Sequence, residues 1–134
     1  MLRHFLLGKI HRCVVTRADI SYVGSVTLDP LLIEAAGFLE NEKVDLYNVT
    51  TGVRFATYVI PGERGSGEVG INGAAAHLVS VGHLMIIASY GWLNASEMAG
   101  HRPKAVFVDE KNRIVEVRDQ ERNPPVRDIS AVRS

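Results

Sequence analysis

The stretch VDLYNVTTGVRFATYVI at residues 44–60 contains two runs rich in β-branched and aromatic residues, on either side of Thr51-Gly52. Two such runs joined by a turn-forming dipeptide predict a β-hairpin of antiparallel strands. Similar runs recur along the chain, and a second hairpin is expected around residues 109–112. We expect strands at residues 9–17, 22–28, 44–49, 53–60, 68–71, 84–89, 105–109 and 113–117. The sequence therefore predicts a mainly β protein.

Two short helices are expected between these strands. Asp29 can cap the first helix, Pro30 suits its first position, and Gly37 can end it in a left-handed conformation. A second short helix is predicted at residues 73–79, where alanines favour helix, although Asn72-Gly73 could equally form a turn. Many short strands with two short helices are typical of a small β-barrel with helical crossovers.

The length of 134 residues suits one folded domain with a hydrophobic core. We expect a single β-barrel domain over residues 1–115. From Glu116 onward charged and turn-forming residues dominate, so residues 116–134 are expected to form a flexible tail, with partner binding by the tail as the alternative. Cys13 has no second cysteine to pair with and lies in a valine-rich run, which predicts a small buried apolar group.

The charge balance excludes two classes of partner. Lysine plus arginine and aspartate plus glutamate are equal in number, 15 of each, so the chain lacks the positive field that holds nucleic acid or an acidic membrane surface. The longest apolar run, residues 84–88, is far shorter than the ~20 residues of a membrane-spanning helix. The apolar run near the N-terminus ends at Gly8 and is too short for an export signal, so we expect a cytoplasmic protein.

The dipeptide Gly24-Ser25 is a weak signal by itself, because Gly-Ser pairs are common in turns. Its neighbours make it informative. Five runs are GKIHR (8–12), TRADISYVGSVTLD (16–29), TGVRFATY (51–58), GERGSG (62–67) and INGAAAHL (71–78). Together they closely resemble the bacterial aspartate 1-decarboxylase family, a family of carboxy-lyases, and the resemblance extends from Gly8 to about Tyr90. It is far more specific than any single motif.

The resemblance implies a small double-psi β-barrel that cleaves itself between Gly24 and Ser25. It also implies a homotetramer with active sites between adjacent subunits, which converts L-aspartate to β-alanine and CO₂ for pantothenate and coenzyme A biosynthesis. In such a cleavage the Ser25 hydroxyl attacks the carbonyl of Gly24, and the resulting ester eliminates to leave a pyruvoyl group derived from Ser25. Gly24 lacks a Cβ and can adopt the strained or positive-φ geometry that this attack requires. The sequence does not indicate whether a maturation factor assists.

The chemistry of decarboxylation explains why such a group is needed. Loss of CO₂ from an amino acid leaves electrons on the α-carbon, and no unmodified side chain accepts them. An imine with an electrophilic carbonyl does, which is usually the role of pyridoxal phosphate. Lys9 cannot replace that carbonyl, because lysine Schiff bases serve carbonyl substrates rather than amines. We therefore expect a covalently bound pyruvoyl group from Ser25, with no metal and no pyridoxal phosphate.

The resemblance also assigns roles to side chains on the predicted strands. Arg54 matches the residue that binds a substrate carboxylate, and Lys9 matches a second cation near the dianionic substrate. Tyr58 matches the acid that protonates the α-carbon, as a phenol can at neutral pH. Thr57 matches a threonine that contacts substrate and assists self-cleavage, for which a hydrogen bond to the oxyanion is expected. Because Thr57 and Tyr58 are adjacent on a strand, a bulge or twist is needed for both to reach one site.

Other family positions lie in loops and turns. The substrate or pyruvoyl group is expected to contact the backbone amides of Asn72, Gly73, Ala74 and Ala75. His11 and Tyr22 match positions around the cleavage site and are given supporting roles in self-cleavage. Two positions depart from the family pattern: Tyr47, where some members have tryptophan, and His83, where an acidic residue is common. We expect these departures to affect local packing.

Each assignment has a structural alternative: an exposed strand lysine, a solvated arginine, a core tyrosine, a satisfied histidine, or a turn before an alanine-rich helix. Two alternative functions also stay open. One is a pyruvoyl decarboxylase of another amino acid such as glutamate, and the other is a non-catalytic double-psi barrel that serves as a binding module. Cleavage at Ser25 separates the binding module from the enzymes, and turnover of aspartate against glutamate separates the two enzymes.

Overall fold

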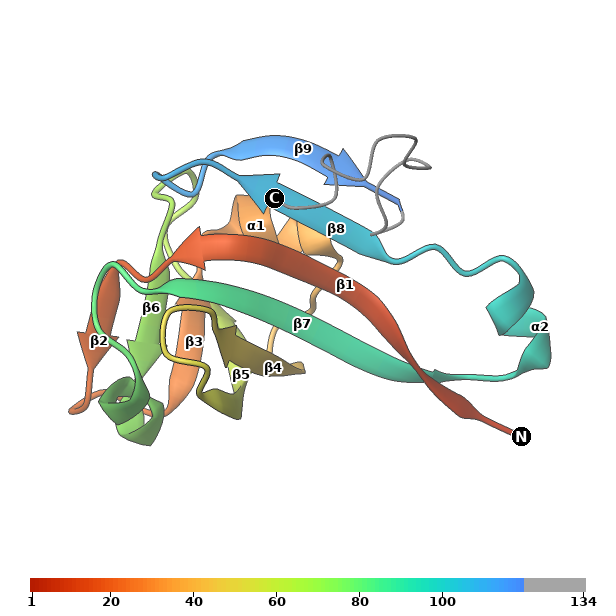
Figure 1. The fold of residues 1–134 in the computed structure, drawn as a ribbon, viewed down its shortest axis with the longest axis horizontal. Coiled ribbons are helices and arrows are strands. Elements are labelled where there is room, and N and C mark those ends of the chain that lie inside the picture. The colour runs from red at the N-terminus through yellow and green to blue at the C-terminus, as the bar shows by residue number, and fades with distance from the viewer. Residues whose placement is uncertain (120–134) are drawn as a thin grey trace.

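The computed structural model describes residues 1–119, which form nine strands, two α-helices and one 3₁₀-helix (Figure 1). In chain order these are β1 (Arg3–Val14), β2 (Arg17–Asp19), β3 (Ser25–Leu28), α1 (Pro30–Ala36), β4 (Lys43–Asn48), β5 (Arg54–Pro61), β6 (Val69–Asn72), η1 (Gly73–Leu78), β7 (Leu84–Leu93), α2 (Ala95–Ala99), β8 (Lys104–Val108) and β9 (Ile114–Arg118). Strands dominate, which confirms the prediction of a mainly β protein with short helices.

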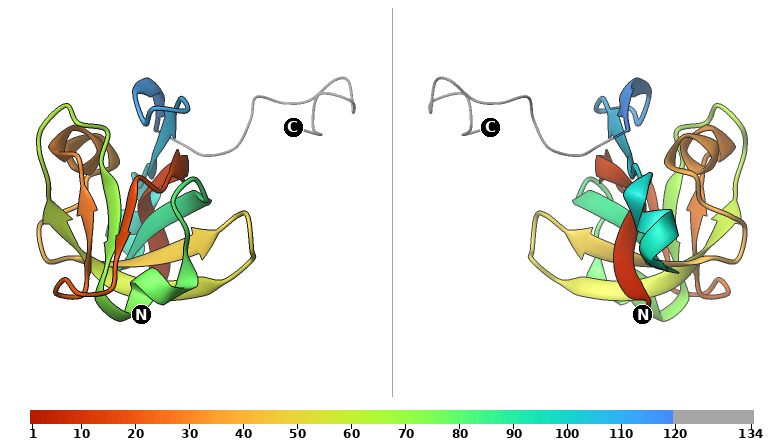
Figure 2. Two further views of the ribbon diagram at one scale, coloured as in Figure 1. Left: turned by 90° about the vertical axis from the view of Figure 1, so that its left-hand side faces the viewer. Right: turned by 90° about the vertical axis from the view of Figure 1, so that its right-hand side faces the viewer.

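The nine strands form one sheet in the order β2-β6-β3-β5-β4-β7-β1-β8-β9, and the sheet curls into the small barrel that the sequence predicts (Figure 2). Sequence neighbours β4 and β5, and β8 and β9, form antiparallel hairpins. Three further pairs are parallel: β1 with β8, β2 with β6, and β3 with β5. These non-local parallel pairs bring the segment before Ser25 next to β6.

The hydrophobic core lies on the inner face of this sheet. Ile10, Val26, Leu46, Val59 and Ile87 come from five different strands and are completely buried. Along β4 and β5 buried residues alternate with more exposed ones, as expected for strands with one face on a core. Cys13 is also completely buried, as predicted, and burial raises the pKa of its thiol to about 12, so it stays protonated.

The β4–β5 hairpin has a longer connection than the two-residue turn that the sequence predicts. The last residue of β4 is Asn48 and the first of β5 is Arg54, so residues 49–53 form the loop. The Asn48 side-chain oxygen accepts hydrogen bonds from the backbone N–H groups of Thr50 and Thr51, at 2.9 and 3.1 Å. Gly52 adopts a φ of 84° and donates its N–H to the Asn48 carbonyl. The asparagine therefore sets the loop length.

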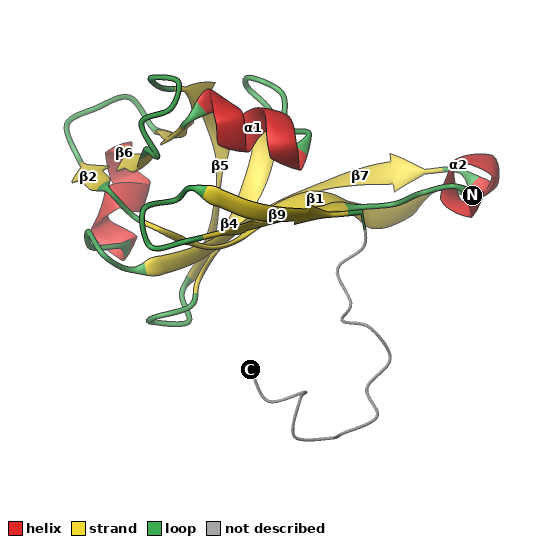
Figure 3. Ribbon diagram, turned by 90° about the horizontal axis from the view of Figure 1, so that it is seen from above, coloured by secondary structure: helices red, strands yellow, loops and turns green. Residues whose placement is uncertain are grey.

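The first helix follows its sequence signals closely. The Asp29 side chain accepts a hydrogen bond from the Leu31 N–H, Pro30 opens α1, and Gly37 closes it with a φ of 76°. The helix packs against β1 and β8 on one side of the sheet (Figure 3). The second expected helix is η1, a 3₁₀-helix rather than an α-helix, and it contacts β2 and β6.

Several element boundaries differ from the sequence prediction. The expected strand at residues 9–17 divides into β1 and β2, and the expected strand at 22–28 begins only at Ser25. Helix α2 was missed, although Asn94 and Glu97 have the spacing of a capping box and form one. Strand β9 continues past residue 115, so the expected start of the tail at Glu116 falls inside a strand. Residues 120–134 lie outside the described part of the chain.

The long strands β1 and β7 run side by side and extend away from the barrel, with α2 beyond their far end (Figure 1). The opposite end of the molecule carries β2, β3, β6 and η1. None of the helices within residues 1–119 has the length and apolar composition of a membrane span.

Candidate active site

Ser25 lies where the chain passes from an exposed loop into the buried sheet. Residues 20–24 are exposed, whereas Ser25, the first residue of β3, is only 1% exposed. The Gly24–Ser25 peptide bond therefore joins a solvent-facing residue to one held by the sheet. Such a position combines access to the bond with a fixed side chain on one side of it.

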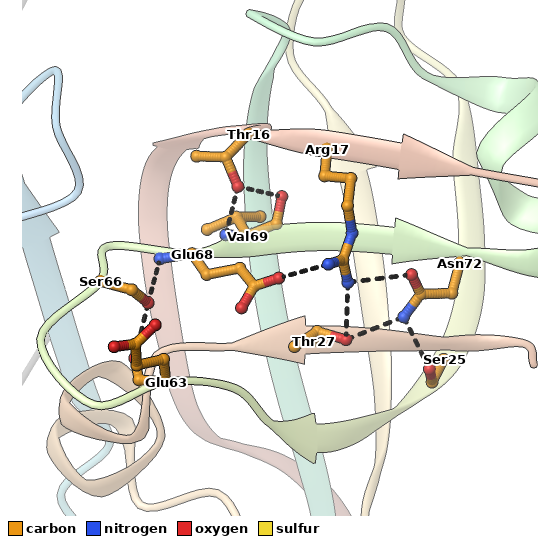
Figure 4. Close-up of polar contacts among 9 residues, drawn as sticks. All are labelled: Thr16, Arg17, Ser25, Thr27, Glu63, Ser66, Glu68, Val69 and Asn72. Carbon is orange, nitrogen blue, oxygen red and sulfur yellow. Dashed lines mark hydrogen bonds and ion pairs between the residues drawn. The ribbon is translucent and has the colours of Figure 1, made fainter. Parts of the chain in front are cut away.

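The Ser25 hydroxyl is held by two hydrogen bonds, and Figure 4 shows the one with Asn72. It donates to the carbonyl of Val23 at 3.2 Å and accepts from the Asn72 side-chain Nδ2 at 2.9 Å. Asn72 is completely buried and also donates from Nδ2 to the Thr27 hydroxyl at 2.8 Å. The sheet explains this contact, because Ser25 on β3 is directly opposite Asn72 on β6. Sequence reasoning named Ser25 and Asn72, and the structure brings them together.

Gly73 closes the site from the other side. It has a φ of 71°, and a Cβ built there would lie 2.7 Å from the Gly24 Cα and 3.2 Å from the Tyr22 carbonyl oxygen. Only glycine permits so close an approach of these two backbone segments. The other members of the predicted loop, Ala74 and Ala75, follow in η1, exposed and half-buried respectively.

Gly24 itself differs from expectation. Its φ is not in the left-handed region, and a Cβ built on it would meet no atom within 4 Å. The expected positive-φ geometry is therefore absent from this conformation. The glycine that the cleavage site requires sterically is Gly73, whose Cβ-free surface lies against Gly24.

Tyr58 lies beside Ser25 according to the sheet register. Val26 pairs with Val59 in the parallel β3–β5 ladder, and continuing this register by one residue places Tyr58 next to Ser25. Val26 and Val59 face the core, so Ser25 and Tyr58 share the opposite face. Thr57 pairs with the core residue Val44, and the β4–β5 ladder has no register shift. Thr57 and Tyr58 therefore project from opposite faces, and the expected bulge is absent.

Arg54 rests on a tyrosine pair. Its guanidinium carbon lies 4.5 Å from the centroid of the Tyr47 ring, a cation–π contact, and the Tyr47 hydroxyl lies 2.7 Å from that of Tyr90. Burial and the Tyr90 hydroxyl raise the pKa of Tyr47, so it remains a neutral phenol. Tyr47, expected to affect only packing, supports the candidate substrate-binding arginine. Arg54 lies four residues along β5 from Tyr58, roughly 13 Å at the rise of a strand.

Lys9 is buried on β1, with only 7% of its surface exposed, so it is not the exposed strand lysine of the alternative interpretation. It pairs with Ala88 on β7, which pairs with Asp45 on β4, which pairs with Ala56 on β5. Three strand spacings, roughly 14 Å, therefore separate the backbone of Lys9 from the strand that carries Arg54.

The two supporting residues lie in different places. Tyr22 is exposed in the loop before the cleavage site, and its carbonyl faces Gly73. His11 lies on β1 with its ring 5.3 Å from that of Phe107 on β8. In the sheet, β1 is separated from β3 by β5, β4 and β7. His83, the second departure, accepts or shares hydrogen bonds with Asn48 and the Ser80 N–H, consistent with a packing role.

Sequence reasoning missed three polar residues around Asn72. Arg17 on β2 lies within hydrogen-bonding distance of Asn72 and Thr27, and forms an ion pair with Glu68 (Figure 4). Arg17 and Thr27 fall inside the run 16–29, but their meeting depends on the parallel β2–β6 pair. Within residues 1–119, no group of three or more His, Cys, Asp or Glu side chains gathers in a metal-binding arrangement.

The comparison with known proteins agrees with this geometry. A sequence model of the aspartate decarboxylase family matches residues 1–115. The chain belongs to the aspartate decarboxylase family. Two members of that family, both named aspartate 1-decarboxylase, come from Caldicellulosiruptor saccharolyticus and Caldicellulosiruptor bescii. They are 54% and 51% identical to the chain over 121 residues, which is 90% of this chain and 94% of each relative. The family resemblance that the sequence motifs indicate is confirmed.

Proposed function

We propose that this member of the aspartate decarboxylase family converts L-aspartate to β-alanine and CO₂, with a pyruvoyl group that it makes from Ser25. Family membership supports the reaction, and β-alanine would serve pantothenate and coenzyme A biosynthesis. The observation that carries the proposal is the buried Ser25 hydroxyl, held by Asn72 at the end of an exposed loop.

Self-cleavage would begin with attack of the Ser25 oxygen on the carbonyl carbon of Gly24. The new C–O bond replaces the C–N bond of the peptide, and the hydroxyl proton passes to the freed serine nitrogen. Loss of the Ser25 α-proton then breaks the Cβ–Oγ bond and releases Gly24 as a carboxylate. Addition of water to the remaining dehydroalanine expels ammonia and leaves the pyruvoyl group. Asn72 supports the first step, because its Nδ2 fixes the attacking oxygen.

The residues around Ser25 fit a pyruvoyl group at this position. The Asn72 Nδ2 that now donates to the serine oxygen can donate to a carbonyl oxygen there, and Gly73, packed against Gly24, brings no side chain into the site. The pyruvoyl carbonyl would bind the substrate amine and accept the electrons left when CO₂ departs. Tyr58, beside Ser25 on the same face, would then supply the proton to the α-carbon.

Substrate binding is proposed for Arg54 and Lys9, with the backbone amides of residues 72–75. The Tyr47 ring beneath Arg54 leaves the guanidinium fork free to pair with a carboxylate. Arg54 lies roughly 13 Å along β5 from Tyr58. The backbone of Lys9 lies roughly 14 Å across the sheet from β5. This spread supports a site completed by a neighbouring subunit. On family membership we further propose a homotetramer with sites between subunits, located in the cytoplasm. Supporting roles in self-cleavage are proposed for Thr57, His11 and Tyr22 on the family resemblance. Within one subunit only Tyr22 lies next to the scissile bond, because Thr57 projects from the other face of β5 and His11 lies on β1.

The test combines mass measurement with turnover. Intact-mass spectrometry of the purified 14.7 kDa chain should show two fragments that meet at the Gly24–Ser25 bond, the second lighter by one ammonia. Ser25→Ala should remain uncut and release no CO₂ from aspartate. An intact wild-type chain after prolonged warm incubation would refute the proposal and favour the binding module. A cleaved protein that decarboxylates glutamate faster than aspartate would assign the other substrate.

A further inference from the structure

The cleavage site lies on a face of the sheet where three strands align their side chains in rows. Arg17 on β2 is opposite Gly70 on β6, and Gly70 is opposite Thr27 on β3. The next row on the same face contains Asn72 and Ser25. Arg17 is the first residue of the short strand β2 (Arg17–Asp19), and its guanidinium lies over this face.

Arg17 is held over this row by its neighbours. Its guanidinium forms an ion pair with Glu68 at 3.0 Å, and Nη2 lies 3.4 Å from both the Thr27 hydroxyl and the Asn72 Oδ1 (Figure 4). A Cβ built on Gly70 would lie 2.9 Å from Nη2. The missing side chain of Gly70 therefore makes room for the guanidinium. The Arg17 side chain is 46% exposed, so its anchors and not burial keep it in place.

These contacts decide which way the Asn72 amide points. Arginine has only donors, so the Asn72 atom that faces Arg17 must be the oxygen Oδ1. The Nδ2 group is then directed to Ser25, where it donates to the hydroxyl oxygen. Without the arginine, the Thr27 and Ser25 hydroxyls could satisfy either orientation, because a hydroxyl can donate or accept. In the flipped orientation Oδ1 would draw the Ser25 hydroxyl proton toward itself and away from the Val23 carbonyl.

We propose that Arg17 is a positioning residue for self-cleavage, which acts by fixing the orientation of the Asn72 amide. Glu68 holds the guanidinium by an ion pair, and Gly70 leaves the space that the guanidinium occupies. The inference rests on the proposed self-cleavage at Ser25 and adds a residue that touches neither the scissile bond nor Ser25. It assigns to β2 a part in maturation.

The experiment follows self-cleavage of freshly synthesised chains by intact mass, so its readout does not depend on decarboxylation. Arg17→Met removes the donors while keeping the apolar stem, and Gly70→Ala displaces the guanidinium without removing it. Arg17→Lys keeps the charge beside Glu68 but lacks the fork that reaches Asn72. The matched control is Arg64→Met, which removes an arginine of a similar ion pair, with Glu34, on the exposed surface. Each substitution is also made with Ser25→Ala to measure thermal unfolding of the uncut chain.

We expect Arg17→Met to slow cleavage about tenfold, the effect of losing a charged hydrogen bond at partial exposure. Gly70→Ala should slow cleavage several-fold. Arg17→Lys should cleave faster than Arg17→Met but more slowly than the wild type, and Arg64→Met should cleave at the wild-type rate. Cleavage of Arg17→Met within twofold of the wild-type rate would overturn the inference. If Arg17→Met fails to fold, Gly70→Ala decides, and a wild-type rate for that folded variant overturns it as well. Absence of cleavage in the wild type would instead refute the proposed function.

Discussion

Replacement of Asp29 by asparagine should destabilise the protein although it exchanges only one non-hydrogen atom. Asp29 is 3% exposed, and its carboxylate accepts three backbone hydrogen bonds. Oδ1 accepts from Leu31 at 2.9 Å and Gly65 at 3.0 Å, and Oδ2 accepts from Gly67 at 2.8 Å. Asp29 thereby fastens the start of α1 to the loop before β6. In Asp29→Asn an NH₂ group must face at least one of these N–H donors.

The cost can be estimated from these contacts. One charged hydrogen bond contributes about 1.5–3 kcal/mol, and leaving a buried N–H without an acceptor costs about 1–3 kcal/mol, overlapping in part. We predict that Asp29→Asn lowers the free energy of unfolding by about 2–4 kcal/mol at neutral pH. Asp29→Ala should cost more, because it also removes the cap of α1, a contribution of about 1 kcal/mol. These losses are large against the total of about 5–15 kcal/mol for a typical domain.

The same carboxylate gives a pH dependence of known sign. Burial alone would raise the pKa of Asp29, but the N–H groups of Leu31, Gly65 and Gly67, aided by the charge of Arg64, lower it below the usual value. Its contribution to stability is therefore fully present above the unfolded-state pKa of about 4. That contribution is lost as pH falls through the lower folded-state pKa. Asparagine does not titrate, so the gap between the two proteins should narrow in acid.

Chemical denaturation at fixed protein concentration measures both effects. The substitutions are made with Ser25→Ala, so that every chain stays uncut, and are compared at pH 7 and over a series down to pH 3. Arg64→Met is the control, because Arg64 affects Asp29 only through its charge. A loss below about 0.5 kcal/mol at pH 7 would contradict the reasoning, as that is the size of an ordinary surface change. A gap that stays constant in acid would refute the pH argument.

Three further predictions concern the site and the core. Tyr47→Leu should raise KM for aspartate about three- to tenfold with kcat little changed, because it removes the aromatic seat of the candidate carboxylate-binding arginine, and Tyr47→Phe should behave nearly as wild type in steady-state assays. Gly73→Ala should block self-cleavage, as followed by intact mass, because a Cβ on Gly73 would collide with the backbone of Gly24. Gly24→Ala should leave the thermal unfolding of the uncut chain unchanged, because a Cβ on Gly24 meets no other atom. Asn112→Ala should lower the free energy of unfolding by about 3 kcal/mol in denaturant titrations, because its side chain bonds to both Val14 backbone groups and to the Gly67 carbonyl.

Local signals predicted local structure well. The limits of α1 followed from Asp29, Pro30 and Gly37, because capping depends only on nearby residues. The hairpin at residues 44–60 was predicted, but its loop length was wrong, because Asn48 folds the chain back earlier than Thr51-Gly52 would. A two-residue turn would have paired Arg54 with residue 49.

That error in loop length concealed part of the candidate site. The observed register pairs Arg54 with Tyr47, so the tyrosine lies directly across the strand from the arginine. Arg17 was missed for another reason: it reaches Asn72 only through a parallel pairing of strands far apart in sequence. Pairings of this kind leave no periodic signal in the chain. The family motifs identified Ser25 and Asn72 from the sequence. The contact of Arg17 with Asn72 could be found only in the folded structure.

The place of the scissile bond also fixes what cleavage would do to the whole molecule. The segment before Ser25 includes β1, which is paired with β7 on one edge and β8 on the other, and β2, which is paired with β6. A cut at this bond would leave a protein of two interwoven polypeptides held together by non-covalent contacts alone. Unfolding would then release separate molecules and would gain an extra translational entropy that the uncut chain never has. Maturation would change the molecularity of unfolding, so that the stability of the mature protein depends on its concentration.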